Sequence, residues 1–120
     1  MAVDPSFLRF VEDQLGQAVS VRTRSMFGGV GIYGDERFFA IIDDDTVYFK
    51  VDDTNRPDFE EAGTGPFLPF GDETKPMQYY RVPGDLLEDA DALAPWVRKA
   101  IEVADRAAAG KKKAGKKKKG

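Results

Sequence analysis

The chain carries few side chains that could do covalent chemistry. Its 120 residues include no histidine and no cysteine, which excludes a histidine base, a cysteine nucleophile, disulfides and zinc sites built from those residues. The three serines, Ser6, Ser20 and Ser25, lie outside any G-x-S-x-G motif. A base would have to be Lys50 or Lys75, and neither stands beside a partner motif. The sequence therefore predicts a protein that is not an enzyme.

Two clusters resemble ligand sites without having the required spacing. Asp43, Asp44 and Asp45 are consecutive, but neither calcium-loop spacing nor a distal bidentate glutamate follows them. Consecutive aspartates between two apolar segments are typical of a hairpin turn. We therefore expect a turn there, and no metal or other cofactor in the protein.

The second cluster is glycine-rich and follows a predicted strand. It lacks the G-x-G-x-x-G pattern ahead of a helix and the Gly-Lys-Ser/Thr ending of a phosphate loop. Because another strand follows, the glycines indicate a bulge or turn where no side chain fits. The residues of this predicted structural motif are Met26, Phe27, Gly28, Gly29 and Gly31.

Basic residues recur on the predicted strands. Arg22 and Arg24 are two residues apart, so their side chains project to the same side of a strand. Lys50 and Arg81 lie on strands that could join this stripe. The simpler interpretation is a solvated surface whose arginines pair with nearby carboxylates. The alternative, which makes these four residues a candidate partner-binding face, is a stripe that receives phosphate or an acidic partner.

The charge of the chain is divided unequally. Seven of its 18 basic residues lie after Gly110, which leaves 11 basic and 21 acidic residues, a net charge of −10, in Met1–Ala109. We expect a folded domain over residues 1–109 and a disordered tail over residues 110–120, because the tail has no apolar surface to bury. Its lysines are candidate nucleic-acid contacts without base specificity: Lys111, Lys112, Lys113, Lys116, Lys117, Lys118 and Lys119.

The apolar pattern predicts one α+β domain. Asp4 and Pro5 form a helix start signal. The segment Asp52–Thr54 can cap a short middle helix that runs to about Ala62. A C-terminal amphipathic helix contains Trp96. If Asp91 caps it, Pro95 lies only one turn in; otherwise Pro95 should kink the helix. The predicted strands are Val19–Met26, Val30–Tyr33, Phe38–Ile42, Thr46–Val51 and Met77–Val82. We expect a single antiparallel sheet of about five to six strands, with the N- and C-terminal helices packed on it.

Aromatic residues are harder to place. Tyr79 and Tyr80 should point to opposite faces of their strand, one into the core and one outward. Phe67 and Phe70, in a proline- and glycine-rich loop, are expected to point inward. An exposed ring near the arginines would indicate recognition of a partner.

The chain resembles the N-terminal domain of the TfoX/Sxy competence-regulator family. The resemblance opens on the segment from Arg24 to Tyr33 and extends over about Phe7–Ala104. The further matching segments, in the same order, are Phe38–Ala40, Val47–Asp52, Asn55–Gly63, Met77–Pro83 and Leu93–Ile101.

The resemblance implies a small α+β domain that regulates gene expression without an established enzymatic activity or cofactor. Members act as positive regulators of natural competence together with the cyclic-AMP receptor protein. Full-length competence regulators carry a second, C-terminal domain, and a lysine tail stands in its place here. No agreed binding residues of the family can be transferred to this chain.

We therefore expect a non-enzymatic regulatory or interaction domain, a transcription co-regulator with a protein partner and a tail that adds non-specific nucleic-acid affinity. Two alternatives stay open: a small nucleic-acid-associated protein dominated by its tail, and an unrecognised enzyme or small-molecule binder. The longest apolar run, Phe38–Ile42, is far too short to cross a bilayer, and Asp4 is atypical of a signal peptide. A cytoplasmic location without membrane contact is expected.

Overall fold

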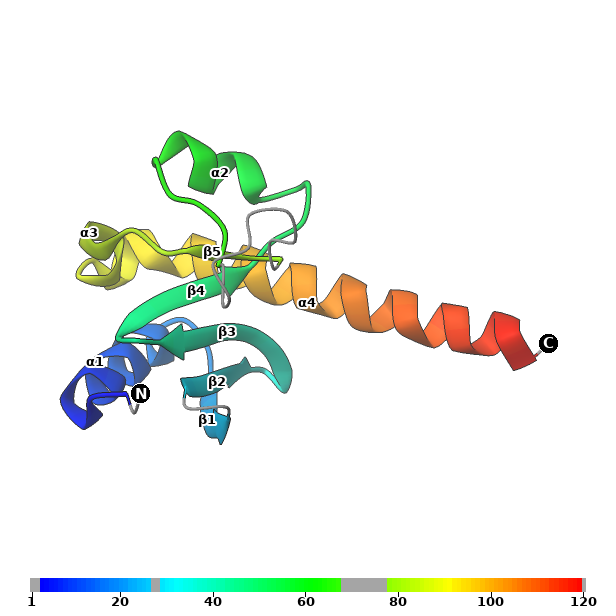
Figure 1. Cartoon of the computed structure of the whole chain (residues 1–120), viewed down its shortest axis with the longest axis horizontal. Coiled ribbons are helices and arrows are strands. Elements are labelled where there is room, and N and C mark those ends of the chain that lie inside the picture. Colours follow the sequence, from blue (N-terminus) through cyan, green and yellow to red (C-terminus); the bar gives the residue numbers. More distant parts are fainter. Residues whose placement is uncertain (1–2, 27–28, 68–77, 120) are drawn as a thin grey trace.

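A computed structural model of the chain describes residues 3–26, 29–67 and 78–119, and confirms one antiparallel sheet combined with helices (Figure 1). In the described part the sheet has five strands in the order β1-β2-β3-β4-β5. The elements are α1 (Pro5–Gly16), β1 (Val21–Met26), β2 (Gly29–Gly34), β3 (Arg37–Asp43), β4 (Thr46–Lys50), α2 (Arg56–Glu61), β5 (Tyr79–Arg81), α3 (Gly84–Leu87) and α4 (Ala90–Lys119).

Helix α1 begins where the sequence predicts. The carboxylate of Asp4 accepts a hydrogen bond from the backbone N–H of Ser6 at 3.1 Å, and Pro5 occupies the first turn. The backbone N–H of Asp4 in turn donates to Oδ1 of Asp45 at 3.0 Å. This contact ties the start of α1 to the turn between β3 and β4.

Two tight turns set the register of the central strands. Asp35 and Glu36 between β2 and β3 have φ angles of 50° and 68°, and Asp44 and Asp45 between β3 and β4 have φ angles of 51° and 55°. Two consecutive residues with positive φ are typical of the two-residue turns that match strand twist. The predicted hairpin turn at the aspartate cluster is confirmed.

One face of the sheet is covered by helices and forms the core. Helix α4 packs on β3 and β4, and α1 packs against α4 and β1. Figure 1 shows both helices on the same side of the sheet. The buried side chains that the sheet and helices bring together include Val11, Leu15, Ile32, Phe39, Ala40, Ile42, Val47, Phe49, Leu93, Val97 and Ala100. We call this side of the sheet the helix-covered face.

A bulge interrupts the alternation on β3. Ile32 pairs with Ala40, but the next residue, Tyr33, pairs with Phe38. Phe39 therefore has no partner on β2, and both Phe39 and Ala40 are fully buried although they are neighbours. The bulge returns Phe38 to the opposite side of the sheet from Phe39.

Three local predictions need correction. Helix α2 begins after Asn55, because Asp52 uses its carboxylate to accept hydrogen bonds from Thr54 rather than to cap the helix. The short helix α3 was not predicted. Helix α4 begins at Ala90, after a hydrogen bond from the Ala92 N–H to the Asp89 carboxylate, and not after Asp91.

The loop before β5 also differs from expectation. Phe67 is half-buried and its ring lies 4.6 Å from that of Tyr48, on the face opposite the helices rather than in the core. Phe70 lies outside the described residues. Both tyrosines of β5 are largely covered: Tyr79 is 7% exposed, and Tyr80 packs 6.0 Å from Phe59.

Helix α4 is longer than the predicted C-terminal helix. It includes Pro95 and runs to Lys119, so the predicted boundary near Gly110 does not coincide with the end of the helix. Figure 1 shows its C-terminal part running away from the sheet. The division of the chain into a folded domain and a disordered tail stays a prediction.

Candidate functional site

The acidic residues form no cation site among residues 3–26, 29–67 and 78–119, where no three carboxylates are grouped so that they could hold a metal ion. In the aspartate turn, Oδ1 of Asp45 accepts from the Asp4 backbone. The carbonyl of Asp44 accepts from the Thr46 hydroxyl at 3.3 Å. The oxygens of Asp44 and Asp45 therefore stabilise the turn through hydrogen bonds.

The glycine motif has a steric reason at Gly29. A β-carbon at this position would lie 2.5 Å from the main-chain carbonyl oxygen of Ile42. No side chain fits at that distance, because a backbone atom cannot rotate away. Gly29 thus permits the close approach of β2 to β3; both Gly29 and Gly31 lie within β2 and not in the predicted bulge or turn. Phe27 and Gly28 lie outside the described residues.

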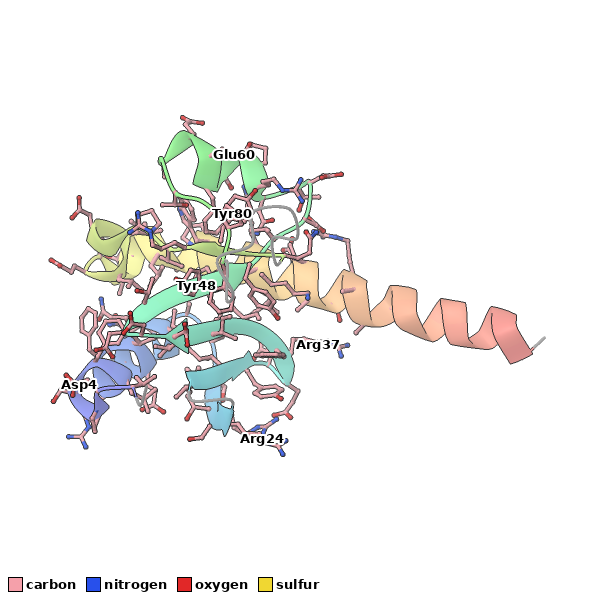
Figure 2. The ribbon with its side chains drawn as sticks, in the orientation of Figure 1. Asp4, Arg24, Arg37, Tyr48, Glu60 and Tyr80 are labelled. Carbon is pink, nitrogen blue, oxygen red and sulfur yellow. The ribbon has the colours of Figure 1, made fainter. Side chains whose placement is uncertain are left out.

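The sheet face opposite the helices brings the predicted basic residues together. Directly paired residues of antiparallel strands share a face, so the strand register places all four predicted basic residues on this side. We call it the basic-aromatic face and define it by Arg22, Arg24, Tyr33, Phe38, Tyr48, Lys50, Tyr79 and Arg81. Figure 2 labels Arg24 and Tyr48 on it.

The first row of this face runs from β1 to β3. Arg22 pairs with Tyr33, and Tyr33 pairs with Phe38. The guanidinium carbon of Arg22 lies 4.4 Å from the centre of the Tyr33 ring, and the Tyr33 and Phe38 rings are stacked at 5.2 Å. A guanidinium over an aromatic face is attracted by the negative potential of the ring. The row therefore fixes one cation and two rings side by side.

The second row crosses all five strands. Arg24 pairs with Gly31, Gly31 with Ile41, Ile41 with Tyr48, and Tyr48 with Arg81. Four strand spacings of about 4.8 Å place the backbones of the two arginines about 19 Å apart. Both arginines are exposed, while Ile41 and Tyr48 between them are half-buried. The row has a cation at each end and apolar surface in the middle.

The third row continues the first. Lys50 pairs with Tyr79, and its ammonium nitrogen lies 5.1 Å from the centre of the Tyr79 ring. The Tyr79 ring in turn lies 6.1 Å from that of Phe38. The aromatic surface is therefore continuous from β2 to β5.

Burial favours the neutral form of two phenols of this face, Tyr48 and Tyr79. Desolvation, followed by the nearby carboxylate of Asp43, raises the pKa of Tyr48 even though Arg81 acts in the opposite direction. Desolvation, with a smaller contribution from Tyr33, also raises the pKa of Tyr79. At neutral pH both hydroxyls remain protonated and can donate hydrogen bonds.

The arginines of this face are weakly held by carboxylates. Arg22 pairs with Glu36 at 3.4 Å, but the two side chains are 54% and 82% exposed, so the pair contributes little. Within the part of the chain that the structure describes, Arg24 and Arg81 form no ion pair. These arginines are positioned by the strands and not by carboxylates.

Sequence reasoning found the cations of this face and missed its rings. Tyr33, Phe38 and Tyr48 were not predicted as site residues. These rings could be found only from the pairing register of the strands, which the turns determine. The bulge at Phe39 changes the alternation on β3, so alternation alone does not place Phe38 on this face. The predicted contact residues of the tail, Lys111 to Lys119, lie in the last part of α4, and their role stays a prediction.

A separate hollow lies between α2 and α4. Asp58, Glu61, Ala62 and Trp96 line it. The Asp58 carboxylate is already paired with Lys99 at 2.8 Å. Its residues belong to helices on the other side of the sheet, so it adds nothing to the basic-aromatic face.

Comparison with known proteins identifies the family. The TfoX N-terminal domain family matches residues 13–104. The chain belongs to this family. The match spans the whole sheet and the part of α4 that packs on it, so all residues of the basic-aromatic face are part of the TfoX N-terminal domain.

A curated relative of this TfoX N-terminal domain comes from Spirochaeta aurantia. It is named an uncharacterized 12.7 kDa protein in the trpE 5′ region. The two chains are 33% identical over 90 residues, which cover 75% of this chain and 73% of the relative. None of the helices, as far as the structure describes them, has the length and apolar character needed to cross a membrane.

Proposed function

We propose that this TfoX N-terminal domain is a non-catalytic regulator of gene expression that acts by binding, and that the basic-aromatic face is its contact surface. The observation that carries the proposal is the placement of four cations and four aromatic rings on the sheet face opposite the helices. Such a face suits a partner that combines negative charge with flat apolar groups.

The rest of the domain supports a binding role. The body carries a net charge of −10 over Met1–Ala109, so a negatively charged partner is repelled by most of its surface. Four of the 11 basic residues of Met1–Ala109 lie on the basic-aromatic face. Elsewhere Arg37, Arg56, Lys99 and Arg106 are each paired with an aspartate, so this face gives a negatively charged partner a preferred orientation. The lysine tail adds general affinity for nucleic acid, without selecting a sequence.

The proposal is tested in the organism from which the gene comes. Full-length wild type, a gene deletion and the double variant Arg22→Gln/Arg24→Gln are compared by transcript profiling, with protein levels checked by immunoblot. The proposed function predicts that the double variant changes the same transcripts as the deletion, because its contact surface has lost two charges.

The matched control is Arg9→Gln/Arg98→Gln. Arg9 on α1 and Arg98 on α4 are exposed and lie outside the basic-aromatic face, so this variant loses the same charge elsewhere. It should behave as wild type. If both double variants gave the wild-type transcript profile, the proposed function would be contradicted.

A further inference from the structure

We infer that the basic-aromatic face binds a single-stranded nucleic acid, with bases against its rings and phosphates at its arginines. The inference rests on the proposed function and names the partner class of the same surface. It is carried by the Arg24–Arg81 row, in which the half-buried Ile41 and Tyr48 occupy the middle and exposed arginines the two ends, and by the Arg22–Tyr33–Phe38 row beside it.

The first row offers a flat group for stacking at Arg22. Tyr33 lies between the Arg22 guanidinium and the Phe38 ring, so its own faces are covered and the surface it supports for a base is the outer plane of the guanidinium. Tyr48 is held against the Phe67 ring. Rings that are fixed in advance lose little conformational entropy when a ligand stacks on them. Stacking on aromatic side chains of a sheet surface is the usual means of holding unpaired bases.

The arginines are placed to contact the phosphates of one nucleic-acid strand. Arg24 and Arg81 stand at the two ends of one row, about 19 Å apart by strand spacing. A single nucleic-acid strand that lies along this row would meet a cation at each end and apolar surface between the two cations. A duplex cannot use the middle of the row, because its bases are already stacked and paired.

An acidic protein segment fits the face less well. Its carboxylates would pair with exposed arginines, and such pairs contribute little in water. It would bring no flat surface to the rings, whereas a nucleotide supplies both a charge and a ring. Single-stranded nucleic acid is therefore the partner that the geometry favours.

The β2–β3 turn links the edge of this face to α4, which lies on the other side of the sheet and leads to the lysines. The β2–β3 turn contacts Arg22 through Glu36, and contacts α4 through the Arg37–Asp105 pair at 2.7 Å. Figure 2 shows Arg37 beside α4 where the helix leaves the sheet. The first lysine of the tail follows Asp105 by six residues. A nucleic-acid strand bound at Arg22 could thus pass the β2–β3 turn and continue along the lysine tail.

The test measures binding by fluorescence anisotropy in the full-length chain with all seven tail lysines changed to Gln, so that the face is measured without the tail. The probes are oligo-uridine and oligo-thymidine of about 12 nucleotides, and a duplex of the same length. We expect both single strands to bind more tightly than the duplex. The tighter of the two shows whether RNA or DNA is the better ligand.

Two kinds of variant locate the contact. Arg22→Gln/Arg24→Gln should reduce the slope of log affinity against log salt by roughly 1.4, at about 0.7 for each lost phosphate contact. Tyr33→Leu, or Tyr48→Leu as a second ring variant, should weaken binding at least about fivefold through lost stacking. Thermal melts verify that each variant is folded, and Arg9→Gln/Arg98→Gln should leave the slope nearly unchanged.

Three results would overturn the inference: equal affinity for duplex and single strand, equal effects of the face and control variants, or absence of oligonucleotide binding while an acidic peptide binds. If any of these occurs while Arg22→Gln/Arg24→Gln still changes the transcripts, the partner class is wrong and the proposed function stands. If the transcripts are also unaffected, both fail.

Discussion

Glu36 holds a backbone conformation that an L-residue rarely adopts, with φ at 68° in the turn between β2 and β3. The left-handed region costs a non-glycine residue about 1–2 kcal/mol, and the extra flexibility of an unfolded glycine offsets roughly 0.5–1 kcal/mol. The backbone cost at Glu36 is larger than the entropic cost of glycine. Glu36→Gly should therefore raise the free energy of unfolding by about 0.5–1 kcal/mol.

Urea denaturation followed by Trp96 fluorescence checks this prediction. Glu88→Gly is the matched control, because Glu88 is exposed and has an ordinary φ of −82°. It should lose stability or leave it unchanged. A Glu36→Gly protein less stable than wild type would show that the strain at this turn is smaller than the entropy of glycine.

Gly29 should tolerate no side chain. In Gly29→Ala the new methyl group would meet the Ile42 carbonyl oxygen, so β2 and β3 must move apart. The free energy of unfolding should fall by about 1–3 kcal/mol. Gly84→Ala is the control, because a β-carbon there meets nothing within 4 Å. Comparable denaturation midpoints for the two variants would contradict the steric account.

At the residue scale, the sequence could predict the cations of the site but not its rings. Arg22 and Arg24 share a face because residues two apart on a strand always do. Which rings join them depends on the pairing of β2 with β3. The bulge at Phe39 cannot be inferred from alternation, since it places two neighbouring residues in the core.

Helix α4 is attached to the rest of the domain by ion pairs as well as by apolar packing. Arg106 donates to Asp52 at 3.1 Å and to Thr54 at 2.8 Å. Partial burial acts to raise the pKa of Asp52, but hydrogen bonds from Thr54 and Arg106 outweigh it and hold the pKa below its ordinary value of 3.8. The ionised carboxylate is therefore the form that the fold stabilises.

This pKa shift predicts a pH dependence with a defined sign. Because the folded pKa is depressed, the stabilisation is present above the unfolded pKa and is lost as pH falls through the folded pKa. Asp52→Asn should cost less than about 1 kcal/mol at pH 7, since the pair is partly exposed. The difference from wild type should vanish below the folded pKa of Asp52.

Denaturation of wild type and Asp52→Asn between neutral pH and pH 2.5 measures this difference. Glu102→Gln, an exposed position on the same helix, should show no such decrease. A wild-type advantage that persists at the acid end would contradict the assignment to the Asp52 carboxylate.

At the element scale, most of the fold could be predicted. Turn residues and apolar alternation locate the four long strands, and Asp4 with Pro5 locates the first helix. The start of α4 was missed because Asp89, and not Asp91, supplies the cap. Helix α3, of four residues, is too short for periodicity to reveal.

At the scale of the whole molecule, charge is divided between an acidic body and a basic C-terminal segment. The core residues all precede Asp105, so deleting Gly110–Gly120 should leave the fold intact. The deletion should remove most salt-sensitive binding to duplex DNA, because each lost phosphate contact lowers the salt slope by about 0.9.

Mobility shifts at low and high salt, with a thermal melt of each protein, test this division. The full chain should shift random-sequence DNA at low salt and release it as salt is added. Equal shifts for the full and truncated chains at low salt would show that the tail does not carry the non-specific affinity.

The most direct test of the binding surface is an NMR titration of the ¹⁵N-labelled full-length chain with oligo-thymidine. The account predicts that amide shifts concentrate on the strand segments that carry Arg22, Tyr33, Phe38 and Tyr48, with α1 little changed. Shifts confined to residues 110–120, or spread over α1 in place of the sheet, would contradict it.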